Sequence, residues 1–326
     1  MFGATSLGNL FRAIDPQEKS RIVEQWVANV APPIVIDSAG KYGAGMSLEV
    51  IGRELDRIGI PKSNVVISNK LAWRRTPLIT AEPTFEPGAW FGLEHDAVQD
   101  ISHDGILRCF EEGNAFLSPY AADLVSVHDP DEYLAAATDD SDLKKRTTDI
   151  VGAYRALERL RDDGKVAAVG IGAKNWQSIQ WLSNYCRFDW VMFANSYTIY
   201  SHPIELLEFM NRLSNDGVGI INSALLHGGF LVGGDFFDYR KIDAVVPSDA
   251  AKIEWRNQFW SICREFDISP MDAACAFGRQ PKAVNTVAIS SSRADRVASH
   301  VQSVALTIPE PFWTALRNER LINNLP

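Results

Sequence analysis

The sequence predicts an α/β barrel of eight parallel strands and eight helices, and three observations support this. Short apolar runs rich in β-branched residues alternate with amphipathic stretches along the chain, as expected of parallel strands covered on both faces. Eight runs of each kind follow one another in strict alternation, which is the pattern of a (β/α)₈ or TIM barrel. The 326 residues suffice for a single barrel domain, 1–326, with a C-terminal segment, about 302–326, packing on the barrel.

Strands are expected where an apolar run stops at a polar or small residue. They are Phe2–Leu7, Pro33–Asp37, Val65–Lys70, Leu124–His128, Val166–Gly172, Trp190–Asn195, Val218–Ser223 and Thr286–Ser290. The alternative fold is a doubly wound open sheet. It is disfavoured because no G-x-G-x-x-G turn follows the first strand.

Helices are expected where the apolar residues recur with helical spacing. They are Pro16–Val30, Ser47–Ile58, Asp104–Leu117, Thr148–Asp163, Gln177–Tyr185, Ile204–Asn215, Pro247–Glu265 and Arg293–Val301. Ser47 and Asp104 are suitable N-caps, and Gly59, Gly164 and Gly217 stand where helices should stop.

Two connections are too long to be plain loops, namely Leu71–His103 and Leu225–Val246, after the third and seventh strands. Long aromatic loops after barrel strands usually form the substrate mouth. We therefore name Trp73, Trp90 and His227 as candidates for the substrate wall. The alternative, packing inside the loops' own small cores, has at least equal weight.

Composition narrows the classes of partner and compartment. A formal net charge of -9 disfavours nucleic acid and anionic membranes as partners. The four cysteines form no C-x-x-C pair. No charged segment followed by an apolar one, as in a signal peptide, stands at the start, and no apolar run is long enough to span a bilayer. We expect a cytoplasmic protein with buried, reduced thiols and no metal, because His and carboxylate ligands do not cluster at the strand ends.

Four titratable side chains stand at or just past the ends of three successive strands. Asp37 and Tyr42 follow the second strand, Lys70 ends the third and His128 ends the fourth. In a parallel barrel these ends share one face, so the four groups should converge. Each residue alone has an ordinary structural explanation, such as a cap, a turn or the core.

Together they suit proton transfer to or from an oxygen whose carbon gains or loses a hydride. A neighbouring ammonium such as Lys70 favours the phenolate of Tyr42 and brings its pKa nearer working pH. Asp37 would hold Lys70 charged, and His128 would orient the substrate oxygen. None of these groups carries a hydride, so a nicotinamide cofactor is implied.

The motif Asp37-Ser38-Ala39-x-x-Tyr42-Gly43, together with Lys70 and His128-Asp129-Pro130-Asp131, resembles the aldo-keto reductase superfamily from Phe2 to about Val301. This resemblance implies a (β/α)₈ barrel, an NAD(P) cofactor and a catalytic tetrad of Asp37, Tyr42, Lys70 and His128. The sequence begins almost on the first predicted strand, so we expect the barrel bottom to lack the short N-terminal hairpin that family members usually carry.

Three further segments are similar to the sugar 1-dehydrogenase branch, whose members oxidise L-fucose, D-threo-aldoses or L-galactose. They are Phe2–Phe11, His103–Arg108 and Ser223–Leu231. Pyridoxal 4-dehydrogenases are similar to this branch, so the substrate is less defined than the family.

The resemblance also implies a cofactor side. Asn175 matches the asparagine of the family's Ser-Asn pair, without an evident serine, and Tyr197 matches a tyrosine near the sixth strand, without the usual glutamine. The alternative places both outside any site, as a loop residue and a core residue. The remaining candidates lie after the seventh and eighth strands: Ser223, Leu225, Ser290, Ser291, Ser292, Arg296 and His300.

The run Ser290–Arg296 offers hydroxyls and free N–H groups at a helix start, which suits a phosphate, with ordinary N-capping as the alternative. Ser290 stands where NADP-preferring members often carry lysine, whereas Arg296 is kept. Ser299-His300 replaces the common Glu-Asn pair near the adenine. Because one of the two basic residues is absent, the sequence favours NAD as cofactor, with NADP tolerated.

The favoured function is oxidation of an aldose hemiacetal at C1 to the lactone, with the hydride passing to NAD(P). The alternatives are a pyridoxal 4-dehydrogenase or an NADPH-dependent aldehyde or ketone reductase using the same tetrad. An alternative of another class is a nicotinamide-binding regulatory subunit. The expected partners are a small sugar or aldehyde and, as an option, a second copy in a homodimer.

Overall fold

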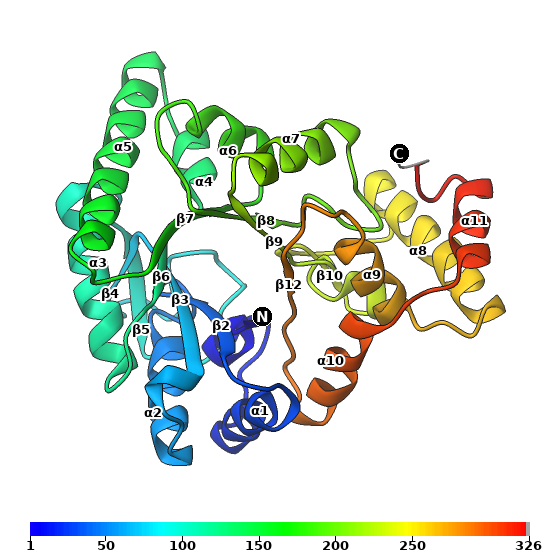
Figure 1. Cartoon of the computed structure of the whole chain (residues 1–326), viewed down its shortest axis with the longest axis horizontal. Coiled ribbons are helices and arrows are strands. Elements are labelled where there is room, and N and C mark those ends of the chain that lie inside the picture. The colour runs from blue at the N-terminus through cyan, green and yellow to red at the C-terminus, as the bar shows by residue number, and fades with distance from the viewer. Residues whose placement is uncertain (324–326) are drawn as a thin grey trace. The chain divides into compact units, whose positions relative to one another are not determined.

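The computed structural model describes residues 1–323, and its main sheet has eight strands in the order β1-β2-β3-β6-β7-β8-β9-β12 (Figure 1). A parallel bridge between Phe2 and Ile289 joins β1 to the residue that follows β12, as in a barrel. The strands are β1 (Phe2–Gly3), β2 (Ile34–Ala39), β3 (Val65–Leu71), β6 (Leu124–His128), β7 (Ala168–Ala173), β8 (Trp190–Ala194), β9 (Gly219–Ser223) and β12 (Thr286–Ala288). The predicted barrel is confirmed.

The first strand is shorter than the sequence predicted. It ends at Gly3, and the chain turns through a 3₁₀ helix, η1 (Thr5–Gly8), instead of continuing to Leu7. The cause is a close backbone approach. A Cβ on Gly8 would lie 2.6 Å from the carbonyl carbon of Tyr42, so only glycine fits there. This turn brings the chain after β1 against the loop that carries Tyr42.

The eight predicted helices are present with shifted ends. They are α1 (Pro16–Asn29), α2 (Met46–Ile58), α3 (His103–Leu117), α5 (Asp140–Asp162), α6 (Trp176–Leu182), α7 (Ile204–Asn215), α8 (Pro247–Glu265) and α10 (Val297–Ala305). The largest shift is at α5, which begins eight residues before Thr148 because Asp139 caps the N–H of Asp142.

Three helices were not predicted, namely α4 (Pro130–Ala135), α9 (Pro270–Arg279) and α11 (Glu310–Asn318). α4 has only six residues, which is too short for a helical period to show. Packing explains α9 better than periodicity does, because a run of its residues from Ala273 to Gly278 is buried throughout.

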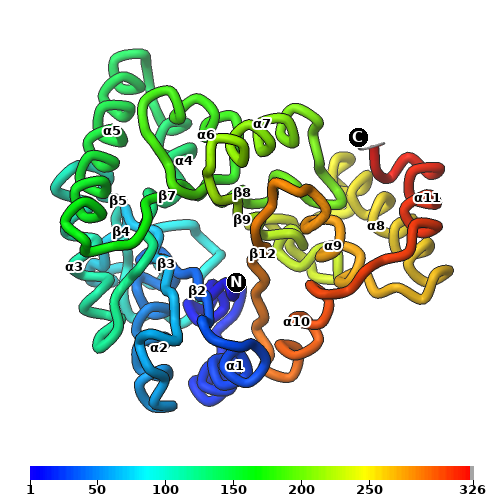
Figure 2. Tube along the Cα trace, in the orientation of Figure 1, coloured from blue at the N-terminus to red at the C-terminus, as the bar shows by residue number. Residues whose placement is uncertain are grey.

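Both long connections contain structure of their own. The first forms an antiparallel hairpin of β4 (Trp73–Pro77) and β5 (His95–Gln99), which lies in the cyan part of the trace (Figure 2). The second contains a short 3₁₀ helix, η3 (Phe230–Val232), and the strands β10 (Phe236–Phe237) and β11 (Arg240–Lys241). The long loops expected after the third and seventh strands are thus present.

The chain divides into two compact units. The first, hereafter unit 1, comprises Met1–Met192 and Ala288–Ala298. The second, hereafter unit 2, comprises Phe193–Val287 and the residues from Ser299 onward. The expectation of one domain, 1–326, stays a prediction, and the last three residues of its C-terminal segment lie outside the described part. Among the described residues no helix is long and apolar enough to cross a membrane.

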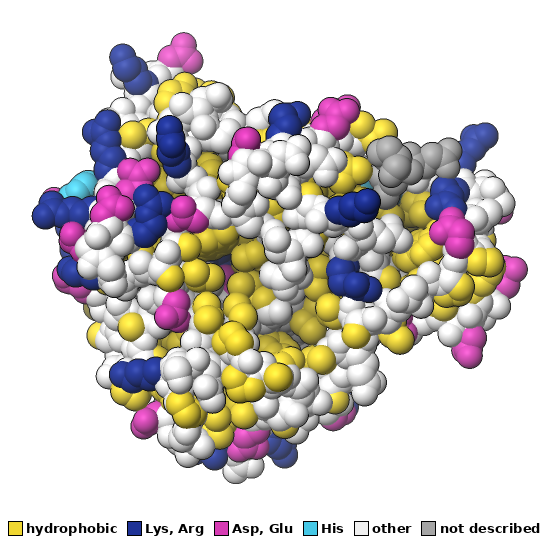
Figure 3. Space-filling model, viewed as in Figure 1, with side chains coloured by type: hydrophobic (Ala, Val, Ile, Leu, Met, Phe, Trp, Pro, Cys, Tyr) yellow, Lys and Arg dark blue, Asp and Glu magenta, His cyan; other side chains and the backbone are white. Residues whose placement is uncertain are grey.

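In unit 1 the helices α2, α3 and α5 lie side by side outside the strands (Figure 1). Basic and acidic side chains intermingle over α5 and α3 (Figure 3), and ion pairs such as Arg146–Asp142 account for part of this pattern. The strands are buried between the helices and the barrel interior. One tight fit is Gly170 in β7, where a Cβ would lie 2.1 Å from the Trp190 ring.

Candidate active site

Asp37 and Lys70 form a buried ion pair across neighbouring strands of unit 1. The β2–β3 register pairs Asp37 with Ser68 and Ala39 with Lys70. The Lys70 ammonium donates to the Asp37 carboxylate and, at 3.2 Å, to the carbonyl of Ser38. Ser68 Oγ donates to the second carboxylate oxygen of Asp37 at 3.1 Å. Both charged side chains are buried, so each depends on the other for compensation.

Tyr42 lies in the loop after β2, and its ring faces the other predicted tetrad members. The Lys70 Nζ is 4.7 Å from the centre of the Tyr42 ring. The His128 ring meets the Tyr42 ring edge-on at 5.5 Å. The loop is held close to η1 by Gly43, whose backbone has a φ of 63° and where a Cβ would lie 2.5 Å from the carbonyl oxygen of Gly8.

His128 is the last residue of β6 and is buried. Burial lowers the pKa of His128 well below its ordinary value, against the opposing effect of Asp129 and with the help of Lys70. The imidazole is therefore neutral at neutral pH. Its Nδ1 has no hydrogen-bond partner among residues 1–323. One ring nitrogen is thus available for an oxygen that the protein does not supply.

The structure therefore brings the four predicted residues together from the carboxyl ends of β2, β3 and β6. The set contains a phenol, an ammonium next to its ring, a carboxylate that holds the ammonium, and a neutral imidazole. Chemically, such a set can move a proton between Tyr42 and a bound hydroxyl or carbonyl oxygen. The catalytic roles themselves remain predictions from the sequence.

Trp73 and Trp90 lie in the connection between β3 and α3 and border Tyr42. Trp90 is buried, with its ring 5.9 Å from that of Tyr42 and 6.0 Å from that of Phe85. Trp73 is half-buried and 5.9 Å from Phe85. These residues form an apolar cluster that includes Tyr42. The aromatic residues thus pack on each other, as the alternative predicted, and also border Tyr42. Their role as a substrate wall stays a prediction.

His227, the third candidate for the substrate wall, is buried within unit 2. Its Nε2 is 2.8 Å from Thr198 Oγ1 and its Nδ1 is 2.9 Å from Asp238 Oδ1. Its ring stacks on Phe237 at 4.4 Å. Both ring nitrogens are thus bonded inside the unit, which supports the alternative of packing within the loop. A role in substrate binding stays a prediction.

The cofactor candidates of unit 1 lie at two strand ends. Asn175 is exposed, and its side chain caps α6 by accepting from the N–H groups of Gln177 and Ser178. Ser290 is exposed and Ser291 is buried, with its Oγ donating to the carbonyl of Arg293 at 2.7 Å.

The same serine run has two charged neighbours that the sequence did not point to. Arg12 donates to the carbonyl and the hydroxyl of Ser292 at 3.0 and 3.1 Å. Glu18 Oε1 accepts from the backbone N–H of Ala294 at 2.7 Å. That hydrogen bond lowers the pKa of Glu18. Arg296 is exposed. The serine hydroxyls and the Arg12 guanidinium are donors that fit a phosphate, whereas the N–H of Ala294 is already bonded to Glu18.

The cofactor candidates of unit 2 are mostly buried. Tyr197 is fully buried and stacks on Phe277 at 5.5 Å, as the core alternative predicted. Ser223 Oγ donates to the carbonyl of Phe193 at 3.1 Å, Leu225 is buried, and His300 is half-buried in α10. Their contact with a cofactor stays a prediction.

Sequence reasoning missed Asn195, which follows β8 directly. Its backbone has a φ of 58°, and its buried Oδ1 has no hydrogen-bond partner in the described part of the chain. An unpartnered amide oxygen next to a strand end can accept from the carboxamide N–H of a nicotinamide. The signal was an amide at the end of a predicted strand, which the search for a glutamine passed over.

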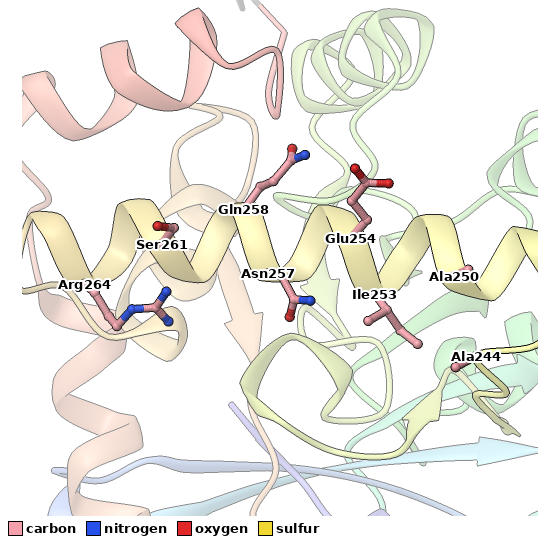
Figure 4. A pocket seen from close by; sticks show the side chains of 8 residues that line it. All are labelled: Ala244, Ala250, Ile253, Glu254, Asn257, Gln258, Ser261 and Arg264. Atoms are coloured by element: carbon pink, nitrogen blue, oxygen red, sulfur yellow. The ribbon is translucent and has the colours of Figure 1, made fainter.

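Two other features do not form a site. A hollow of about 540 Å³ is lined by α8 residues and Ala244, none of them a predicted site residue. Figure 4 shows Glu254 and Gln258 on one side of α8 and Ile253, Asn257 and Arg264 on the other, so their polar groups do not converge.

Glu86, Asp129 and Glu132 have carboxylate atoms within 4.8 Å of one another, a spacing suitable for a metal. However, the Lys41 ammonium lies among them, at 2.7 Å from Glu86 and 2.9 Å from Asp129. A lysine thus supplies the positive charge that a metal would bring. The expected absence of a metal stays a prediction.

The chain is similar to known proteins over nearly its whole length. The family model described as "Aldo/keto reductase family" matches residues 1–318. A pyridoxal 4-dehydrogenase from Microbacterium luteolum is 26% identical and aligns over 98% of this chain and 93% of its own length. A D-threo-aldose 1-dehydrogenase from a Pseudomonas species is also 26% identical, with the same coverage.

Solved structures show the same fold. A glycerol dehydrogenase from Gluconobacter oxydans superimposes with a TM-score of 0.70 at 17% identity, covering 100% of this chain and 93% of its own. An aldo-keto reductase from Bacillus halodurans, in its holo form, gives a TM-score of 0.66 at 17% identity, covering 99% and 92%. These two structures support the (β/α)₈ barrel.

Proposed function

Since this chain belongs to the aldo/keto reductase family and is thus an NAD(P)-dependent oxidoreductase, we propose that it oxidises a cyclic aldose at C1 to the lactone. The observation that carries this proposal is the placement of Lys70, whose ammonium is bonded to Asp37 and lies 4.7 Å from the centre of the Tyr42 ring. A tyrosine beside a fixed, buried cation is suited to accept the proton of a substrate hydroxyl as its phenolate, because the cation favours that form.

In this proposal Tyr42 is the general base. The Lys70 ammonium stabilises the Tyr42 phenolate that accepts the proton, and Asp37 holds the Lys70 ammonium in place. The neutral His128 donates one hydrogen bond to the substrate oxygen and so directs that oxygen toward Tyr42. Such acid–base assistance is typically worth about 10²- to 10⁴-fold in rate. In the reverse direction the same residues would protonate a carbonyl oxygen.

When bound, a nicotinamide dinucleotide supplies the hydride acceptor. In unit 1, the serine run and Arg12 offer donors for a phosphate of such a group. In unit 2, the unpartnered Oδ1 of Asn195 offers an acceptor for an amide N–H. For Asn175, whose side-chain oxygen already caps α6, the amide NH₂ is the group left for a cofactor contact.

The substrate class rests on the relatives and on the walls beside Tyr42. One curated relative is a D-threo-aldose 1-dehydrogenase, and the other is a pyridoxal 4-dehydrogenase. Both substrates carry a hydroxyl next to a compact ring, which Trp90 and Trp73 could flank with their apolar faces. Pyridoxal therefore remains the second candidate substrate, with the same mechanism.

We infer a preference for NAD over NADP, which the charge near the serine run supports. Glu18 already occupies the N–H of Ala294 with a carboxylate, and its side chain is only 23% exposed. A second anion at this helix start would be repelled, whereas a ribose hydroxyl could donate to the carboxylate. NAD lacks the additional phosphate, so it avoids this repulsion.

The test is a spectrophotometric assay of reduced nicotinamide, with NAD and NADP offered in turn against L-fucose, L-galactose, D-arabinose and pyridoxal. Turnover of one sugar supports the proposal, and turnover of pyridoxal alone moves it to the second substrate. Tyr42→Phe should lose at least about 100-fold in kcat while cofactor affinity stays within about twofold. A Tyr42→Phe variant that keeps most of its kcat would overturn the mechanism. Silence on the whole panel with cofactor still bound would favour a reductase or a regulatory subunit.

A further inference from the structure

Lys41 is a buried lysine that the proposed mechanism does not use, although it directly precedes Tyr42. Its side chain is only 2% exposed. The ammonium contacts Glu86 Oε1 at 2.7 Å, Asp129 Oδ2 at 2.9 Å and Glu132 Oε2 at 3.4 Å. It also lies 4.8 Å from the centre of the Trp73 ring. Four segments of unit 1 thus meet at one nitrogen.

This nitrogen carries a positive charge. Although burial alone would lower the pKa of Lys41, the carboxylates of Asp129, Glu86 and Glu132 raise it above its ordinary value. The arrangement is therefore a buried cation with an excess of carboxylates around it. Lys174, which pairs with Glu132 at 2.5 Å, supplies further positive charge from the end of β7.

Two of the three carboxylates sit on strained backbone. Glu86 has a φ of 46° and Asp129 a φ of 49°, in the left-handed region that residues other than glycine seldom adopt. Such conformations persist where surrounding contacts over-determine them. The contacts to Lys41 are the shared feature of these two positions.

Each of these carboxylates is connected to one side of Tyr42. Glu86 Oε2 accepts from Trp90 Nε1 at 2.8 Å, and the Trp90 ring lies 5.9 Å from the Tyr42 ring. Asp129 Oδ2 is 3.6 Å from His128 Nε2. The His128 ring in turn contacts the Tyr42 ring, with 5.5 Å between the ring centres. Through Glu86 and Asp129, the Lys41 ammonium thus links the loop that carries Trp90 to the strand end that carries His128.

We propose that Lys41 is a positioning residue for the oxidation: its ammonium holds Glu86 and Asp129 together, and thereby fixes Trp90 and His128 around Tyr42. This inference rests on the proposed function for the reaction concerned. The link between Lys41 and His128, however, can be measured on the resting protein.

The same ammonium balances the charge that faces His128. The charged groups around that imidazole are Asp129 from its own segment, Lys70 from β3, and Lys41 and Lys174 from the loops after β2 and β7. Asp37 is paired with Lys70. Removing Lys41 leaves the Asp129 carboxylate less compensated at 3.6 Å from Nε2. Protonation of His128 should then become easier, and its pKa should rise.

The experiment compares Lys41→Met with Glu86→Gln and a control, Lys19→Met. Lys41→Met breaks both connections. Glu86→Gln weakens only the Trp90 connection and leaves Lys41 with Asp129 and Glu132, so it also serves if Lys41→Met fails to fold. Lys19 is a buried lysine of α1 whose ammonium faces the sulfur of Met46 at 3.0 Å and no carboxylate. It controls for the loss of a buried lysine as such.

Two quantities are measured in each variant: kcat/KM as a function of pH, and the titration of His128 by NMR of histidine-labelled protein without substrate. In Lys41→Met we expect kcat/KM to fall at least tenfold, and the His128 titration to move to higher pH by at least one unit. In Glu86→Gln we expect a higher KM with kcat largely kept and the His128 titration unchanged. Lys19→Met should resemble the wild type in both measurements.

A Lys41→Met variant with kcat/KM within threefold of wild type, or with an unchanged His128 titration, would overturn the inference. So would a Lys19→Met variant that behaves like Lys41→Met, because the effect would then follow from removing any buried lysine rather than from positioning. If Lys41→Met does not fold, a Glu86→Gln variant with wild-type KM would also overturn it. Silence of the wild type on the substrate panel would overturn the proposed function alone, since the titration is measured on the resting protein.

Discussion

Asp37→Asn should destabilise the protein by about 3 kcal/mol and disable the tetrad. The amide is nearly isosteric with the carboxylate, so its oxygen can still accept from Lys70, while its NH₂ can donate to the Ser68 hydroxyl. The loss is therefore mainly one of charge, not of shape. Besides the amide oxygen, the buried Lys70 ammonium would keep the carbonyl of Ser38 at 3.2 Å and the Tyr42 ring at 4.7 Å as its partners.

Two principles set the magnitude. Breaking one side of a buried ion pair costs about 3–5 kcal/mol because a charge is left uncompensated. There is also a ceiling, because an ordinary lysine gives up its proton at pH 7 for about 4.6 kcal/mol, or about 3.4 pH units at about 1.36 kcal/mol each. Since the amide retains a hydrogen bond, we expect the lower part of the range, near 3 kcal/mol.

The assay is urea unfolding followed by tryptophan fluorescence, with Ser68→Ala as the matched control. Ser68→Ala removes a hydrogen bond that a neutral hydroxyl donates to the same carboxylate at 3.1 Å, and it should cost about 1.5 kcal/mol. A loss in Asp37→Asn no larger than that in Ser68→Ala would refute the view that Asp37 compensates the Lys70 charge. It would also remove the proposed reason for Lys70 being fixed beside Tyr42.

Two further predictions concern charged residues of α1. Burial and the nearby Arg53 lower the pKa of Lys19 to about 8, so its ammonium opposes folding below that pH and stops doing so as pH rises toward the unfolded value of about 10.4. Lys19→Met should therefore raise the free energy of unfolding at pH 7 by about 1–3 kcal/mol. The wild-type free energy of unfolding should rise between about pH 8 and 10, and this rise should be absent from Lys19→Met. Equal pH profiles of the two proteins would contradict this. Glu18→Gln should improve NADP binding about three- to tenfold, with NAD affinity within about twofold, as measured by fluorescence titration; an unchanged preference would exclude Glu18 from cofactor choice.

The sequence alone determined the barrel and the four residues of the predicted tetrad. Both rest on local information. Parallel strands covered on two faces show as continuous apolar runs, and a polar residue at the end of such a run is placed by chain topology alone. Asp37, Lys70 and His128 could therefore be predicted to converge before any contact was known.

Tertiary structure decided what the other residues do. Lys41 and Tyr42 are adjacent in the sequence, yet one lies among Glu86, Asp129 and Glu132 while the other faces Lys70 and His128. No periodicity predicts that contact, because its partners come from distant loops. The same holds for Glu18, which reaches Ala294 across 276 positions. Local patterns specify which elements form and where they end, whereas compensation of a buried charge depends on which distant side chains share the same space.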